Sequence, residues 1–201
     1  MITILNYGMG NLGSIRNMFR RIGVPAEVVD KPEDLRRAHK LLLPGVGAFD
    51  AAMQRIEELG FRAPLDELVL ERRIPVLGIC LGMQLLTHSS EEGTRPGLGW
   101  IGGCARRFPR TTGLPVPHMG WNLVTRSKDS PLTDNLGNDA RFYFVHSYFV
   151  QVDDERDSML RTTYGISFDS GIHRGNIYGT QFHPEKSHKF GMHLLKNFAG
   201  L

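Results

Sequence analysis

The segment PVLGICLGMQLL, residues 75–86, places a cysteine between two glycines, after an apolar β-type run and before a helical pattern. The order glycine–x–nucleophile–x–glycine in GICLG is typical of a nucleophile elbow, with Cys80 where hydrolases have serine. Gly78 and Gly82 allow a sharp turn and close packing of a helix against a strand. At a helix N-terminus, the dipole and free amides favour a thiolate. The pattern predicts a thiol that attacks a carbonyl, with the amide of Leu81 facing the oxyanion.

A thiol nucleophile needs a base, and the base needs an orienting group. QFHPEKS (181–187) follows the strand pattern NIYGT, so His183 is expected at a strand end. On an extended path Glu185 would project to the same side and orient the imidazole. The glycine-rich turn PGVG (44–47) follows another apolar strand, and its amides are candidates for an oxyanion hole together with Leu81. Taken singly, these motifs also fit a buried structural thiol, a surface His–Pro turn and an ordinary loop.

The elements that would hold these motifs alternate along the first half of the chain. Helical patterns alternate with apolar β-type runs, which lie at 2–5, at 26–30, at 40–45 and directly before Cys80. This alternation predicts an α/β fold with a mostly parallel central sheet flanked by helices. From about residue 98, short alternating strands predict a smaller antiparallel extension of one domain, residues 1–201. Helices are expected at 12–22, 31–39, 48–60, 64–72 and 188–199.

The composition indicates an ordinary soluble protein. The chain has 201 residues, a formal net charge of +3 and two cysteines, Cys80 and Cys104, so a disulfide-stapled secreted fold is not expected. No apolar run is long enough to cross a membrane and MITILNYGMG does not read as a signal peptide, which favours a cytoplasmic location. Basic residues are scattered apart from short clusters, so neither nucleic acid nor a membrane is expected as a partner.

Several motifs together resemble the class I, or triad, glutamine amidotransferases, and among them the glutaminase subunits of imidazole glycerol phosphate synthase. The resemblance runs nearly end to end, through YGMGN, LLLPGVGAF, GICLGMQLL, SSEEG, PHMGWN, FYFVHSY, QFHPEKS and LLKNF. It implies a flavodoxin-like fold of the class I amidotransferase type. PHMGWN and FYFVHSY, with no additional acceptor-substrate domain, are the features that point to this subunit.

The resemblance also implies roles for residues at matching positions. Cys80 would be the nucleophile, His183 the general base and acid, and Glu185 the orienting carboxylate. The oxyanion hole would comprise an amide of Val46 or Gly47 together with Leu81. The α-amino and carboxylate groups of glutamine would be held by Gln84, Glu92 and the backbone near Ser147 and Tyr148. Positions at or near a partner interface would be Asn11, Ser14, Trp121, Tyr143 and Lys186.

The implied chemistry is the hydrolysis of L-glutamine to glutamate and ammonia through a Cys80 thioester, without a metal or organic cofactor. The ammonia would pass through a protected channel to a (β/α)8-barrel cyclase in a heterodimer, which would form imidazole glycerol phosphate in histidine biosynthesis.

Other functions stay open at this level. Asn6 stands where family members often have aspartate, and the tail KSHKFGMHLLKNF is not the commonest version. A paralogous subunit that supplies ammonia for amination or amidination of a surface-polysaccharide sugar therefore remains an alternative. A stand-alone cysteine hydrolase of γ-glutamyl compounds would share Cys80 and His183 but need no partner. A non-catalytic binding protein is disfavoured by the complete set of Cys80, His183 and Glu185.

Overall fold

Five parallel strands form the part of the sheet that holds the site. The computed structural model describes residues 1–111 and 113–201. The strands lie in the order β2-β1-β3-β4-β13, so the last strand of the chain is the neighbour of β4. The innermost strands are short apolar runs buried on both faces, as expected for a parallel sheet covered by helices. Their bounds are β1 (Ile2–Leu5), β2 (Ala26–Val29), β3 (Leu41–Leu43), β4 (Val76–Ile79) and β13 (Ile177–Thr180).

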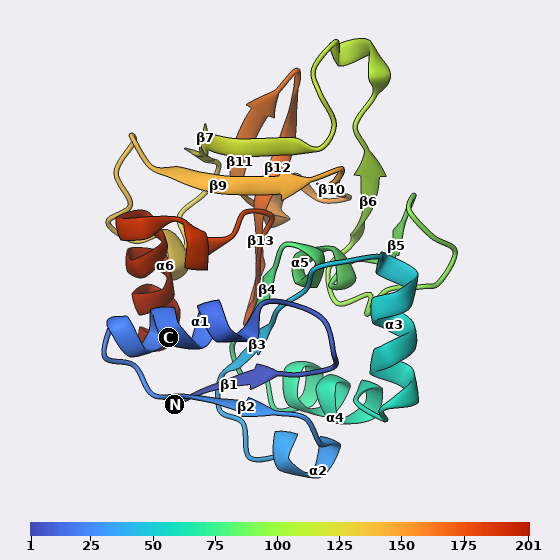
Figure 1. The fold of residues 1–201 in the computed structure, drawn as a ribbon, viewed down its shortest axis with the longest axis vertical. Coiled ribbons are helices and arrows are strands. Elements are labelled where there is room, and N and C mark those ends of the chain that lie inside the picture. The colour runs from blue at the N-terminus through green and yellow to red at the C-terminus, as the bar shows by residue number, and fades with distance from the viewer.

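Helices cover both faces of this sheet (Figure 1). The apolar residues of α1 and α6 pack into one buried cluster, and those of α2, α3 and α4 pack into another on the opposite face. The expected helix at 64–72 is α4 followed by a π-helical turn (Glu67–Glu71), in which Leu68 and Val69 both become buried. The helices are α1 (Leu12–Arg21), α2 (Pro32–Leu35), α3 (Phe49–Glu58), α4 (Arg62–Asp66), α5 (Leu81–Leu85) and α6 (His188–Gly200).

The antiparallel strands expected after residue 98 are present, and most of them extend the main sheet. Beyond β13 the order continues β12-β10-β6-β5, with β11 paired to β12 and β8 paired to β11. A separate two-stranded sheet, β7 with β9, lies across the upper part of the molecule in Figure 1. The bounds are β5 (Ser89–Ser90), β6 (Gly103–Arg107), β7 (His118–Leu123), β8 (Thr125–Arg126), β9 (Arg141–His146), β10 (Tyr148–Val152), β11 (Ser158–Tyr164) and β12 (Ile166–Arg174).

The ends of three neighbouring parallel strands meet at one edge of the sheet. β3 leads into PGVG, β4 leads into Cys80, and β13 leads toward His183. β4 and β13 pair in parallel with Ile79 opposite Thr180, so the two motifs emerge side by side. Ligands of open α/β sheets bind at this carboxyl edge. Within the described residues, no helix has the length and apolarity needed to cross a membrane.

Candidate active site

Cys80 lies on a strained turn between β4 and α5. Its φ of 55° and ψ of −110° are unusual for a residue with a side chain, and such conformations are concentrated at functional sites. The Cys80 amide donates a 2.7 Å hydrogen bond to the Thr180 carbonyl of β13, which fixes the turn. A Cβ on Gly82 would lie 1.9 Å from the Leu43 carbonyl oxygen, and one on Gly78 would lie 2.6 Å from that of Gly82. The two flanking glycines are therefore a steric requirement.

His183 and Glu185 form a buried pair beside this turn. The Nδ1 atom of His183 lies 2.7 Å from Oε1 of Glu185, and the side chains are only 3% and 2% exposed. The local path differs from the extended one that was expected, because Pro184–Lys186 form a 3-10 turn after His183. The Ser187 hydroxyl closes this turn by donating to the His183 carbonyl at 2.6 Å. The carboxylate nevertheless orients the ring.

The surroundings of His183 favour its protonated form. Burial by itself would lower the pKa of the ring, but hydrogen bonds and electrostatic interactions with Cys80 and Glu185 raise the pKa to about 10. Oε2 of Glu185 is buried and has no hydrogen-bond partner among the described residues, so the carboxylate interacts with His183 through Oε1. The imidazole is therefore held ready to give a proton to a leaving group.

Two glutamine side chains link the sulfur to the opposite wall of the site. The fully buried Gln181 directs its amide nitrogen toward Cys80 Sγ at 3.7 Å. The amide nitrogen of Gln84 donates to Oε1 of Gln181 at 3.2 Å and to the Tyr148 carbonyl at 3.1 Å. Both amide hydrogens of Gln84 are thus engaged, which leaves its Oε1 as the atom that can accept from a ligand. Sequence reasoning gave Gln181 no role, although it begins the QFHPEKS motif.

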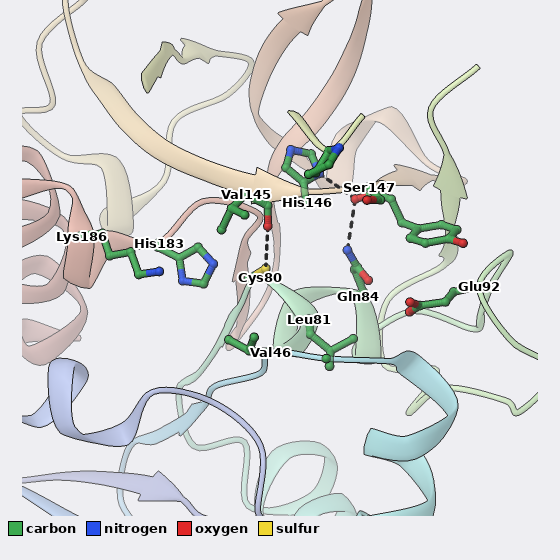
Figure 2. Close-up of a pocket in the computed structure, with 13 residues that line it drawn as sticks. Val46, Cys80, Leu81, Gln84, Glu92, Val145, His146, Ser147, His183 and Lys186 are labelled. Carbon is green, nitrogen blue, oxygen red and sulfur yellow. Dashed lines mark hydrogen bonds between the residues drawn. The ribbon is translucent and has the colours of Figure 1, made fainter. Parts of the chain in front are cut away.

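A cavity of about 320 Å³ opens over Cys80. Figure 2 shows His183 and Lys186 on one side of Cys80, and Gln84 and Glu92 on the other. One carboxylate oxygen of Glu92 accepts a 2.9 Å hydrogen bond from the amide of Phe49, at the start of α3, and this contact fixes its position. The lining residues are Val46, Gly47, Cys80, Leu81, Gln84, Glu92, Pro117, Val145, His146, Ser147, Tyr148, His183 and Lys186.

The cavity thus brings together all the residues suggested for the oxyanion hole and for glutamine binding. Its lining also contains Pro117, Val145 and His146, which sequence reasoning did not select. Pro117 and His146 belong to the quoted PHMGWN and FYFVHSY motifs, but nothing in the local pattern distinguishes a lining side chain from a core one.

The PGVG loop lies against two residues of the NYGMGN turn, Tyr7 and Met9, that were also missed. The buried Tyr7 hydroxyl donates to the Pro44 carbonyl at 2.7 Å. Gly47 has a φ of 123°, and a Cβ there would lie 2.7 Å from the methyl carbon of Met9. In this loop Val46 is half-exposed at the cavity.

The residues suggested for a partner interface fall into two groups. Trp121 and Tyr143 pair across β7 and β9, and the ammonium group of Lys186 lies 5.7 Å from the centre of the Tyr143 ring. Lys186 thereby connects the cavity with this sheet. Asn11 caps α1 by accepting from the amide of Ser14 at 3.2 Å, so these two residues lie together at the start of a different element.

Comparisons with known proteins agree on the family. The glutamine amidotransferase class-I family matches residues 3–200. The chain is 50% identical to imidazole glycerol phosphate synthase subunit HisH 2 of Methanococcus maripaludis, with 98% of each chain covered. It is 49% identical to subunit HisH 2 of Pseudomonas aeruginosa, with 100% of each covered, and 48% identical to subunit HisH of Bdellovibrio bacteriovorus, with 99% of each covered.

Solved structures agree on the fold. The crystal structure of a glutamine amidotransferase aligns with a TM-score of 0.73 at 19% identity, covering 100% of this chain and 99% of the other. PurLQS from Thermotoga maritima aligns with a TM-score of 0.72 at 18% identity, covering 99% of this chain and 97% of the other. With a family match over nearly its whole length and full-length relatives near 50% identity, the chain belongs to the class I glutamine amidotransferases.

Proposed function

We propose that this chain is the glutaminase subunit of an imidazole glycerol phosphate synthase, acting in histidine biosynthesis as a single amidotransferase domain spanning residues 1–201. The observation that carries the proposal is Cys80, held at positive φ at the carboxyl end of β4, beside the hydrogen-bonded His183–Glu185 pair at the end of β13. Relatives at 48–50% identity that are named as HisH subunits support the choice of this enzyme within the family.

In the proposed reaction, the Cys80 thiolate attacks the γ-carboxamide carbon of L-glutamine. The amide of Leu81, with an amide of Val46 or Gly47, stabilises the oxyanion. His183 protonates the leaving nitrogen, so ammonia departs and a γ-glutamyl thioester remains. The same imidazole then takes a proton from water, which attacks the thioester and releases glutamate.

The free groups of the cavity fit the other end of the substrate. Glu92 has a carboxylate oxygen beyond the one bound to Phe49, and Gln84 has its amide oxygen. Both are acceptors, so they suit the α-ammonium group of glutamine. The backbone of Ser147 and Tyr148 lines the same end of the cavity and is proposed to hold the α-carboxylate.

The proposed partner is a (β/α)8-barrel cyclase subunit, because ammonia released into neutral water would be protonated and lost. The names of the relatives, each a subunit of a synthase, support a two-subunit enzyme. Trp121 and Tyr143 on the β7–β9 sheet, with Lys186 beside the cavity, suit an interface that would seal the ammonia path. Asn11 and Ser14 would extend that interface along the start of α1.

The departure at Asn6 does not touch the cavity. Its side-chain oxygen accepts from the amide of Gly8 at 3.1 Å and stabilises the turn after β1. The glutaminase chemistry is therefore expected to be independent of this substitution. The choice between a histidine-pathway and a sugar-pathway partner depends on the proposed interface around Trp121, Tyr143 and Lys186.

The test is glutamate release from L-glutamine by the purified chain, alone and with a histidine-pathway cyclase plus its nucleotide ligand. We expect weak activity alone, a strong rise with cyclase and ligand, and loss of activity in Cys80→Ala but not in Cys104→Ala. High activity of the chain alone would favour a stand-alone hydrolase. Activation only by a sugar-pathway partner would reject the histidine assignment.

A further inference from the structure

Two buried histidines of the β7–β9 sheet lie beside the cavity, and the proposed chemistry uses neither. His118 of β7 and His146 of β9 are cross-strand partners, and they are 2% and 5% exposed. Nδ1 of His118 lies 2.9 Å from Nε2 of His146, and Nδ1 of His146 lies 2.7 Å from the Tyr148 carbonyl oxygen. The amide nitrogen of Asn122 lies 3.2 Å from the remaining nitrogen of His118. These contacts form one continuous chain.

The direction of this chain follows from its ends. A carbonyl oxygen can only accept, so Nδ1 of His146 must have the hydrogen. Burial lowers the pKa of His118 to about 4 and that of His146 to about 3, so both rings are neutral at physiological pH. In a neutral His146, Nε2 accepts, and Nδ1 of His118 must therefore donate to it. Asn122 donates to His118 and also to the Thr163 carbonyl, at 3.0 Å.

The acceptor at the end of the chain belongs to the cavity wall. The Tyr148 carbonyl also accepts from the amide nitrogen of Gln84, so the two donors together saturate its lone pairs. Gln84 continues through Gln181 to the Cys80 sulfur. A displacement of the 147–148 segment would therefore disturb the orientation of Gln84 as well.

We propose that His118 and His146 are positioning residues that fix the 147–148 backbone in the geometry that binds the α-carboxylate of glutamine. This inference rests on the proposed function. Loss of the His118 donor would leave Nε2 of His146 buried without a partner and free the imidazole to turn away from the Tyr148 carbonyl. The expected consequence is weaker binding of glutamine, with the sulfur itself untouched.

The competing explanation is a purely structural role, because His118 is stacked between aromatic rings. Its ring centre lies 4.0 Å from that of Tyr164 and 4.7 Å from that of Phe144. The two roles predict opposite rankings for two substitutions. His118→Asn keeps an N–H near the Nδ1 position but loses the ring, whereas His118→Phe keeps a ring and loses the donor.

The experiment measures the Kd of L-glutamine by calorimetry in the full chain with Cys80→Ala, so that the ligand is not consumed. We expect His118→Phe to raise the Kd about tenfold, the effect of one buried unpaired acceptor, and His118→Asn to stay within about threefold. Thermal melting of each variant confirms that it is folded. His173→Asn is the matched control, because His173 is partly buried and, like His118, stacked on a tyrosine, but lies outside the cavity lining.

The outcomes separate the two proposals. The reverse ranking, with His118→Asn weak and His118→Phe normal, would overturn the positioning role in favour of simple stacking. An unchanged Kd in both variants would overturn it as well, while leaving the glutaminase assignment intact. Failure of the Cys80→Ala parent to bind glutamine both alone and with the cyclase and its nucleotide ligand would overturn the proposed function, and this inference with it.

Discussion

Replacement of Glu185 by glutamine tests whether the buried carboxylate acts through its charge. Glu185→Gln keeps the size of the side chain and an oxygen that can face Nδ1 of His183, but it removes the negative charge beside an imidazolium that is 3% exposed. The loss of a charge-assisted hydrogen bond and of one charged partner in a buried pair together costs about 2–4 kcal/mol. At about 1.4 kcal/mol per factor of ten, kcat/KM for glutamine should fall about 30- to 700-fold.

The assay is glutamate release in the presence of partner and ligand, combined with an NMR titration of the His183 ring. Because the charge of Glu185 is one of the causes of the raised pKa of His183, the ring should titrate at lower pH in Glu185→Gln. The control is Glu91→Gln, which removes a half-exposed carboxylate paired with Arg106 at 3.2 Å and should change kcat/KM less than about twofold. A kcat/KM within threefold of the parent, with an unchanged titration, would refute the role given to Glu185.

Three further predictions concern packing, docking and pH. Gly82→Ala places a methyl group against a β3 carbonyl oxygen, so the free energy of unfolding measured with urea should fall by at least about 3 kcal/mol, or the variant should not fold. Gly200→Ala is the control, because a Cβ there meets no neighbouring atom and should leave the free energy of unfolding unchanged. Trp121→Ala should weaken partner affinity about 30-fold in a binding titration, with Leu70→Ala, similarly exposed but outside the β7–β9 sheet, as the control. Because burial lowers the pKa of both paired histidines, their contribution to stability is present above about pH 6.5 and is lost as the pH falls toward 4. In the parent, this pair should lower the free energy of unfolding measured with urea by about 4 kcal/mol between pH 7 and pH 5. In His118→Asn, the corresponding decrease should be about half as large.

The nucleophile elbow could be predicted from sequence because its requirements are local. An apolar strand, two glycines around Cys80 and a helix start are all contained in twelve residues. The close approaches at Gly78 and Gly82 are the steric reason that this pattern is informative. The alternation of strands and helices likewise predicted the parallel sheet and its carboxyl edge, where the cavity lies.

Other parts of the site depend on contacts that no local pattern specifies. The pairing of His118 with His146 follows from the register of β7 with β9, which becomes visible only once the sheet is formed. The 3-10 turn after His183 replaced the expected extended path, because Ser187 closes the backbone there. The anchoring of PGVG by Tyr7 joins segments that are far apart in the chain.

The position of β13 in the middle of the sheet has a consequence for biosynthesis. β4 is synthesised about a hundred residues before β13, the strand that must pair with it. The pairing of β4 with β13, in which Ile79 lies opposite Thr180, is therefore a contact of high sequence separation that forms late and slowly. Until β13 is inserted, the sheet has an unpaired edge next to Cys80, and His183 and Glu185 are not in place. A nascent or prematurely truncated chain would therefore hold a thiol without its base. An unfinished chain is therefore expected to lack glutaminase activity, and the strand that later holds the nucleophile is also the strand whose edge stays unpaired for longest.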